Sequence, residues 1–337
     1  MASTYSFDEE QEGSACVPRA VLLCRMLQIG TSALQKTGES YGSSGSSGGG
    51  EGGPVNLEFV LPLLKKVVPE TTDLNWVPAQ PFRETGPSPV AGCFLFGTRR
   101  WLGCVVLCHR PYDLSCQTVE TEMHAPARQA AFGCMLHVNT RVGKMLRGRN
   151  LLFAGFGCGG AIAQILALQY AACHHELYGT HPLKELYTFG SPKTGTAKFC
   201  REFSGTGIRH LRVVVEGDGR PHLPLTCHPP YQPRSAGKKG ETENEGENVP
   251  ELMHTGELCF VPLSTGKSWP TKSPWLAAGT QGNMAYLLDM HKFMPTIGRA
   301  MYQTWHAFTS FISQGGRARE AELPCASSIE EYVERLS

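Results

Sequence analysis

A glycine-rich hexapeptide at residues 155–160 (GFGCGG) is the segment whose residue spacing points most clearly to chemistry. In the pentapeptide GxSxG, a serine at the centre of a sharp strand-to-helix turn attacks a carbonyl carbon, and the outer glycines let strand and helix approach each other. Gly155 and Gly159 stand at the outer positions, and Gly157 stands where the serine would be. Because glycine has no side chain, the sequence predicts the frame of a nucleophile elbow without its nucleophile.

The same six residues also fit GxGxxG, the glycine pattern of dinucleotide-binding folds, with Gly155, Gly157 and Gly160 in register. That pattern expects an acidic residue about 20 positions later, at the end of the following strand. Glu176 has this separation, but it lies at the end of the helix predicted after the glycines, before any strand. The next predicted strand, at residues 186–189, ends without an acid. A dinucleotide-dependent enzyme therefore stays a weaker alternative, and we expect neither a cofactor nor a metal ion.

Two nearby side chains are candidates to replace the missing serine. Cys158 lies one residue past the centre of the elbow, where a side chain points away from the reacting carbonyl and the backbone N–H stabilises the oxyanion. Moving the motif by one residue would put Phe156 where a small residue is required. Ser191 follows a different predicted strand. We therefore expect Cys158 to be a packed residue whose backbone N–H marks one oxyanion position, and neither side chain to be the nucleophile.

Local sequence patterns predict the elements that would hold this turn. An apolar run at residues 151–154 (LLFA) predicts a strand before the glycines, and residues 161–173 have the spacing of a helix after them. A second strand is predicted at residues 186–189 (LYTF). One stripe of the predicted helix is apolar and two glutamines lie outside it: Ile162, Ile165, Leu166 and Cys173 in the stripe, Gln164 and Gln169 outside.

Five stretches between residues 149 and 293 resemble motifs of the class 3 (fungal-type) lipase family, in the family's order and spacing. They are residues 151–166 (LLFAGFGCGGAIAQIL, against GHSLGGALA and its helix), 187–195 (YTFGSPKTG, against YTFGxPRVG), 212–224 (RVVVEGDGRPHLP, against RVVNxxDxVPHLP), 253–258 (MHTGEL, against YxHxGxE) and 289–293 (DMHKF, against DHxxYF). The resemblance implies an α/β-hydrolase fold, with a mostly parallel central sheet flanked by helices, and descent from proteins of lipid metabolism.

The resemblance also places a catalytic acid and a catalytic base on two downstream residues. Asp218 falls on the family's catalytic aspartate and His291 on its catalytic histidine, with Gly157 at the position of the serine. In such a triad the imidazole takes the proton of the nucleophile and returns it to the leaving alcohol, while the carboxylate orients the imidazole. The chain order of nucleophile, acid and histidine is that of the α/β hydrolases.

The chain departs from the family pattern at several positions that carry chemistry. Gly157 replaces the serine, and Phe156 replaces the histidine that precedes it in the family. Residues 102–112 resemble the strand that ends in FRGT or FRGS in the family, but here this segment ends in HRPY. Pro111 has no backbone N–H to donate, and Tyr112 is too large for the place of the small hydroxyl that helps to stabilise the oxyanion. The resemblance thus implies that the nucleophile and half of the oxyanion hole are lost together.

The composition of the chain indicates which classes of partner to expect and in which cellular compartment the protein works. The net charge of +1 provides no general attraction for nucleic acid or acidic membranes, and no apolar run approaches the length of a transmembrane helix. The acidic N-terminal sequence lacks the pattern of a secretory signal. The 13 cysteines are an odd number, with no CxxC pair and no zinc-like spacing. We expect reduced thiols in the core of a cytoplasmic protein.

The predicted domain organisation is a single lipase-like domain with short extensions. The domain spans residues 17–315 and begins with an amphipathic helix at residues 17–35. The segments expected to be flexible or peripheral are the N-terminal tail 1–16, the loops 37–53 and 235–248, and the C-terminal tail 316–337.

The C-terminal tail contains one short predicted helix. Ser328 and Glu331 have the spacing of a capping box, in which the serine side chain closes the first turn of a helix. The apolar face that follows consists of Ile329, Tyr332, Val333 and Leu336. This face is expected either to dock on the core or to meet a partner.

Two functional hypotheses follow from these patterns. The first is a pseudo-lipase that no longer hydrolyses esters and acts as a lipid-binding or protein-interaction module. The alternative is a weak lipid or carboxyl-ester hydrolase that uses Asp218 and His291 with an unconventional nucleophile or an activated water. The expected partners are a lipid, an acyl ester or a protein, and not a nucleic acid.

Overall fold

The computed structural model describes ten segments of the chain. They are residues 6–8, 16–41, 57–78, 91–108, 112, 118–215, 218–223, 252–261, 276–277 and 328–336. His291, His109, Arg110 and Pro111 lie outside the described residues, so the predictions made for them are not followed further in the fold.

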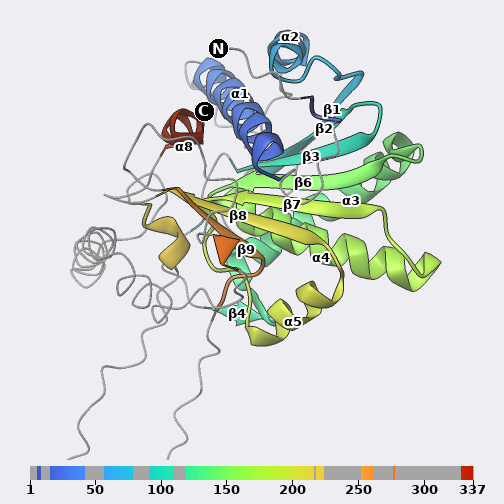
Figure 1. Cartoon of the computed structure of the whole chain (residues 1–337), viewed down its shortest axis with the longest axis vertical. Helices are drawn as coiled ribbons and strands as arrows, with labels where there is room; N and C mark the ends of the chain where they lie inside the picture. Colours follow the sequence, from blue (N-terminus) through green and yellow to red (C-terminus); the bar gives the residue numbers. More distant parts are fainter. Residues whose placement is uncertain are drawn as a thin grey trace, which may run out of the picture.

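An eight-stranded sheet forms the centre of the described structure (Figure 1), in the order β1-β2-β3-β6-β7-β8-β9-β10. Strands β3, β6, β7, β8 and β9 run parallel, and the strands at either edge pair antiparallel. The bounds are β1 Asp73–Pro78, β2 Ala91–Gly97, β3 Trp101–Cys108, β6 Asn150–Phe156, β7 Leu183–Phe189, β8 Arg209–Val215, β9 Glu257–Val261 and β10 Leu276–Ala277. A separate hairpin pairs β4 (Val119–Glu120) with β5 (Met123–His124).

Helices cover both faces of this sheet (Figure 1). One face carries α3 (Ala125–Leu146), α4 (Cys158–Tyr178) and α5 (Ala197–Gly205). The other face carries α1 (Cys16–Tyr41), α2 (Leu57–Val67) and the C-terminal helix α8 (Ile329–Leu336). A short 3₁₀ turn, η1 (Arg220–His222), follows β8. The predicted mostly parallel sheet with flanking helices is confirmed.

The two layers of helices enclose two separate hydrophobic cores. Along β6, Leu151 and Phe153 point into the core under α3 and α4, while Leu152 and Ala154 belong to the core under α1 and α8. This alternation follows from the two-residue period of a strand, and both faces are apolar because both are covered. The strand predicted at residues 151–154 is confirmed as part of β6, which lies between β3 and β7 in the sheet.

Helix α4 includes the predicted helix at residues 161–173 but is buried on more sides than its sequence pattern indicates. Gln164, which the pattern places outside the apolar stripe, is fully buried, and its Nε2 donates a hydrogen bond to Ser191 Oγ over 2.9 Å. Cys173, which the pattern places inside the stripe, is exposed. The prediction was wrong at both positions because the first half of α4 is enclosed between the sheet and α3, whereas its last turns project beyond them.

Helix α1 is held on the sheet by a buried ion pair. Arg19 Nη1 lies 2.5 Å from Glu185 Oε2, which also accepts a hydrogen bond from the Tyr187 hydroxyl over 2.7 Å. The Arg19 guanidinium lies 4.3 Å from the centre of the Trp101 ring, a cation–π distance. The helix ends at Tyr41, six residues beyond the predicted end and inside the loop predicted at residues 37–53.

Phe7 departs from the flexible tail predicted for residues 1–16. Its ring is 1% exposed and meets Phe96 edge-on, with 5.3 Å between ring centres. An aromatic ring gains free energy by leaving water, so this part of the N-terminal segment packs on the core beneath α1.

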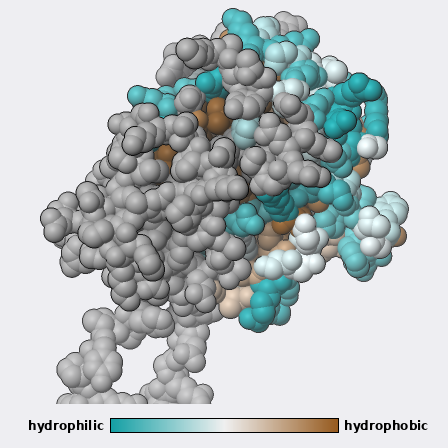
Figure 2. All heavy atoms as spheres, in the orientation of Figure 1, coloured by the Kyte–Doolittle hydropathy of each residue, from teal (hydrophilic) through white to brown (hydrophobic). Residues whose placement is uncertain are grey.

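The surface of the described part is largely hydrophilic in the view of Figure 2, with small apolar areas between. Within that part, no helix combines the length and hydropathy needed to cross a membrane. Nine cysteines have described side chains, and all nine are free thiols.

Candidate functional site

The strand-to-helix turn at Gly157 has the backbone conformation of a nucleophile elbow. Strand β6 ends at Phe156, α4 begins at Cys158, and Gly157 between them has φ 54° and ψ −127°. Residues with a side chain rarely adopt this conformation, and it is the strained position where an elbow holds its nucleophile. The turn is fixed by two backbone hydrogen bonds of 2.9 Å, from Gly157 N–H to Phe189 O and from Gly160 N–H to Gly157 O.

The outer glycines of the motif are required by close backbone contacts. A Cβ atom on Gly155 would lie 2.3 Å from Gly159 O, and a Cβ atom on Gly159 would lie 2.7 Å from Val106 O. Both distances are far below a van der Waals contact, so the strand, the turn and the helix could not approach in this way with larger residues. The frame predicted from Gly155 and Gly159 is present, with a hydrogen atom in place of the side chain at its centre.

The two candidate replacement nucleophiles are both buried in packing positions. Cys158 is fully buried and belongs to the core under α3 and α4, together with Ile162. Ser191 is also fully buried, and its Oγ accepts the hydrogen bond from Gln164 and donates to Pro192 O over 3.2 Å. Neither side chain reaches a surface where an ester could approach it.

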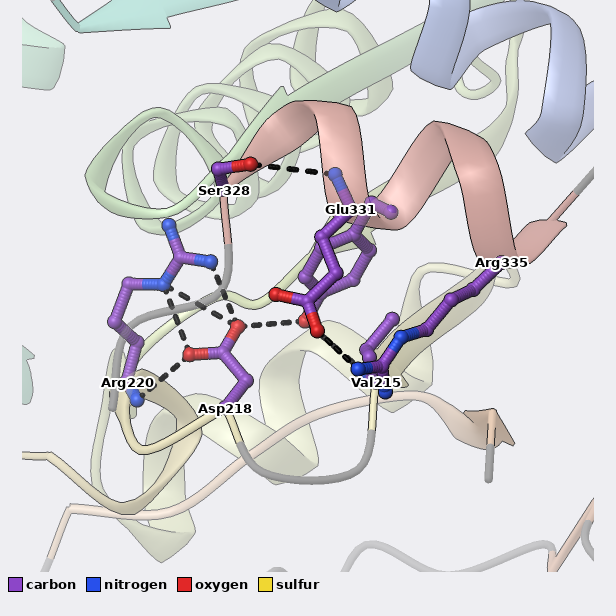
Figure 3. A network of polar contacts seen from close by, with 7 residues as sticks. Val215, Asp218, Arg220, Ser328, Glu331 and Arg335 are labelled. Atoms are coloured by element: carbon purple, nitrogen blue, oxygen red, sulfur yellow. Dashed lines mark hydrogen bonds and ion pairs between the residues drawn. The ribbon is translucent and has the colours of Figure 1, made fainter. Parts of the chain in front are cut away.

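Asp218, at the position of the triad acid, forms a buried ion pair with Arg220 (Figure 3). Arg220 donates from Nη2 to Oδ2 over 2.7 Å and from Nε to Oδ1 over 3.0 Å, and its backbone N–H donates to Oδ1 over 3.1 Å. The Tyr332 hydroxyl of α8 donates to Oδ2 over 2.7 Å. All three residues are almost completely buried.

These contacts use carboxylate acceptor sites of the kind that a catalytic histidine would bond to. A triad aspartate accepts a hydrogen bond from the imidazole Nδ1–H, and this contact sets the tautomer of the base. A carboxylate has about four acceptor sites on its two oxygens, and in Asp218 they receive Arg220 and Tyr332. Among the described residues, Asp218 is the acceptor of a buried ion pair, and its triad position stays a prediction.

Phe156 completes the group around Asp218. The Arg220 guanidinium carbon lies 4.2 Å from the centre of the Phe156 ring, and the Tyr332 ring meets Phe156 edge-on with 5.5 Å between centres. We call Phe156, Asp218, Arg220 and Tyr332 the Asp218 cluster. The Phe156 ring thus provides the face on which the Arg220 guanidinium lies.

Tyr332 is held in its protonated form by its surroundings. Burial, and then the negative charge of Asp218, raises the pKa of Tyr332 well above its ordinary value, against the opposing charge of Arg220. The hydroxyl donates to Asp218 and accepts a hydrogen bond from Val215 N–H over 3.2 Å. Gly190, with φ 56°, leaves room for these groups, because its Cβ would lie 2.4 Å from Asp218 Oδ2.

Sequence analysis missed the roles of Arg220 and Tyr332 in this cluster. A signal for Arg220 was present, since the family pattern DxVPHLP has valine where this chain has arginine, two residues after the aspartate. A charged residue at an apolar position indicates a buried partner of opposite charge. For Tyr332 the sequence predicted the helix and its apolar face, but no local pattern shows which part of the core that face meets.

Two further predicted site residues are Tyr112 and His291. Tyr112 is 6% exposed and packs against the His124 ring at 5.3 Å, within the core under α3. His291 is outside the described residues, so its predicted contact with Asp218 stays a prediction. Among the described side chains, no group of three or more His, Cys, Asp or Glu residues could hold a metal ion.

Comparisons with known proteins address the family. No curated protein sequence matches the chain. Solved structures that resemble it include lipase II from Rhizopus niveus, with 12% identity, 71% of this chain and 80% of that chain covered, and a TM-score of 0.43. Another is a Rhizomucor miehei lipase propeptide complex, with 17% identity, 71% of this chain and 67% of that chain covered, and a TM-score of 0.42. A third is a lipase from Rhizopus microsporus var. chinensis, with 14% identity, 82% of this chain and 86% of that chain covered, and a TM-score of 0.40. Residues 107–228, which include β6, the elbow, β7, β8 and Asp218, match the model of the family described as lipase (class 3).

Proposed function

We propose that this chain is a pseudo-lipase, which keeps the α/β-hydrolase frame but does not hydrolyse esters and acts as a binding module. The observation that carries the proposal is the ion pair between Asp218 and Arg220, closed by the Tyr332 hydroxyl. Gly157 at the centre of the elbow supports it, because the position that should carry the nucleophile has no side chain.

A large loss of esterase activity is expected from the missing nucleophile and from the missing oxyanion donor. Removing a catalytic triad costs about a million-fold in turnover, and losing one oxyanion donor costs about 100- to 1,000-fold. The site lacks a side chain at Gly157, and Asp218 already accepts hydrogen bonds from Arg220 and Tyr332. Hydrolysis would need another nucleophile and another acid together.

The alternative of a weak hydrolase finds little support in the described residues. A Cys158 nucleophile would require a thiol at the surface of the site, and this thiol is fully buried in the core. A water activated by His291 would require Asp218 to orient the imidazole, and that carboxylate is bonded to Arg220.

The binding role is proposed for a lipid, an acyl ester or a protein. Lipase pockets are apolar and accept acyl chains, and such a pocket does not require a working triad to bind its ligand. We also propose a cytoplasmic location, supported by the free thiols among the described cysteines.

Hydrolysis of a medium-chain p-nitrophenyl ester by the purified chain tests the proposal. Wild type is expected to show no turnover above that of His291→Ala, which removes the base that every triad-like mechanism would use. Turnover by wild type that disappears in His291→Ala would overturn the proposal. Inactivation of that turnover by a thiol reagent, absent from Cys158→Ala, would then identify the cysteine as nucleophile.

A further inference from the structure

We propose that the former catalytic site is a receptor for a short amphipathic helix with a tyrosine anchor, and that α8 of this chain is its resident, detachable ligand. This inference rests on the proposed function, because a helix seated on the triad acid serves binding and opposes catalysis. The inference names a class of partner for this site, a helical peptide, in addition to the proposed loss of ester hydrolysis.

The anchor of α8 is buried as deeply as a core residue. Tyr332 is 0% exposed, its hydroxyl bonds Asp218 and Val215, and its ring lies against Phe156 and Phe189 at 5.5 and 6.4 Å between centres. The contacts come from the ends of β6, β7 and β8 and from the turn after β8. These are the carboxyl ends of parallel strands, where α/β folds bind their ligands.

The rest of α8 packs against the molecule through one apolar face. Ile329, Tyr332 and Leu336 are buried at positions i, i+3 and i+7, and α1 provides one side of the contact. Glu330 and Glu334 are exposed on the opposite side. Figure 3 shows the first turn closed by Ser328, whose Oγ accepts a hydrogen bond from Glu331 N–H over 3.2 Å.

Two features make detachment feasible without unfolding the core. A helix of eight residues is not stable alone in water, so α8 owes its structure to docking and is expected to be lost as a unit. When it leaves, Asp218 and Arg220 remain paired with each other, so no buried charge loses its partner.

Hydrogen exchange of the full chain tests the detachment. The α8 amides of wild type are expected to exchange faster than those of β7, because local opening precedes unfolding of the sheet. Tyr332→Phe keeps the ring and removes the hydroxyl, which should speed α8 exchange by about 10- to 100-fold. Glu334→Gln, on the exposed side of the same helix, should change nothing. Equal exchange of α8 and β7 in wild type, or no effect of Tyr332→Phe, would overturn the proposal.

Binding of a peptide in trans tests the receptor. A fluorescent peptide of residues 326–337 is expected to bind full-length Tyr332→Ala more tightly than wild type, whose own tail competes at high effective concentration. The same peptide with phenylalanine at position 332 should bind about 10- to 100-fold more weakly. Equal binding of the two peptides, or no binding to folded Tyr332→Ala, would refute the receptor. Ester hydrolysis by wild type would instead refute the pseudo-lipase and leave the exchange result standing.

Discussion

At the scale of single residues, the role of Asp218 depends on the groups that donate hydrogen bonds to its two carboxylate oxygens. The same aspartate can orient a histidine or neutralise an arginine, but its acceptor sites serve one set of donors at a time. Here Arg220 and Tyr332 provide that set, and Phe156 supports the arginine from its other side. The pseudo-lipase proposal therefore depends on the donors around Asp218 and not on the residue type at this position.

Replacing Arg220 tests the weight of this ion pair in stability. Arg220→Met keeps the length of the side chain and leaves the Asp218 carboxylate buried without its cation, which should cost about 3–5 kcal/mol in the free energy of unfolding. Urea unfolding measures the change. The matched control is Lys198→Met, because Lys198 is exposed and 3.9 Å from Glu122, and its loss should cost less than about 1 kcal/mol. A loss below 1 kcal/mol for Arg220→Met would contradict the account.

Replacing Gly157 tests the strain stored at the elbow. Gly157→Ala places a side chain at φ 54° and should lower the free energy of unfolding by about 1–3 kcal/mol. Gly143→Ala is the control, since this glycine lies in α3 with open space around it, and alanine there should stabilise by about 0.5–1 kcal/mol. Thermal or urea unfolding gives both values, and a neutral Gly157→Ala would show that the turn is not strained.

At the scale of elements, local patterns predicted the pieces of the site and not their partners. The strand at residues 151–154, the helix after it and the cap of α8 follow from apolar spacing and turn chemistry within a few residues. Gln164 could not be placed in the same way, because its burial depends on Ser191 far along the chain. The seat of α8 likewise depends on residues more than a hundred positions away in sequence, and no local pattern carries that information.

The docking of α8 should weaken at high pH. The pKa of Tyr332 is raised in the folded chain by burial and by Asp218, with Arg220 opposing, whereas in a detached tail it is about 10. Its contribution to docking is therefore complete below pH 10 and is lost as the pH rises from 10 toward the raised value. Hydrogen exchange of α8, corrected for intrinsic rates, should speed up above pH 10 in wild type. Tyr332→Phe should show no such pH dependence, and a parallel increase in both proteins would exclude the phenol as the cause.

At the scale of the whole molecule, a series of buried side-chain hydrogen bonds links the parallel strands β7 and β8 to helix α4. His210 of β8 contacts Thr188 of β7 through Nε2 at 2.9 Å and Thr255 through Nδ1 at 2.8 Å, and Thr255 donates to Gln164 of α4 over 3.1 Å. Because the Thr255 hydroxyl donates to Gln164, it accepts a hydrogen bond from His210 Nδ1–H. Burial, and then the charge of Arg212, lowers the pKa of His210 to about 3.

The molecule should lose stability in mild acid through His210. Its unfolded pKa is about 6.5, so its contribution is present above pH 6.5 and is lost as the pH falls toward 3, by up to about 1.4 kcal/mol per pH unit. Urea unfolding between pH 7 and 4 should show this slope in wild type and a flatter one in His210→Gln. His175→Gln, at an exposed position of α4, should keep the wild-type slope. Equal slopes in wild type and His210→Gln would contradict the assignment.

The most direct test of the account is ester hydrolysis by Gly157→Ser beside wild type. The serine restores the nucleophile, but Asp218 stays paired with Arg220 and Tyr332, so both proteins are expected to remain at the background rate for a medium-chain p-nitrophenyl ester. Turnover by Gly157→Ser would show that an acid–histidine pair is still assembled around the elbow, and would contradict the structural role assigned to Asp218.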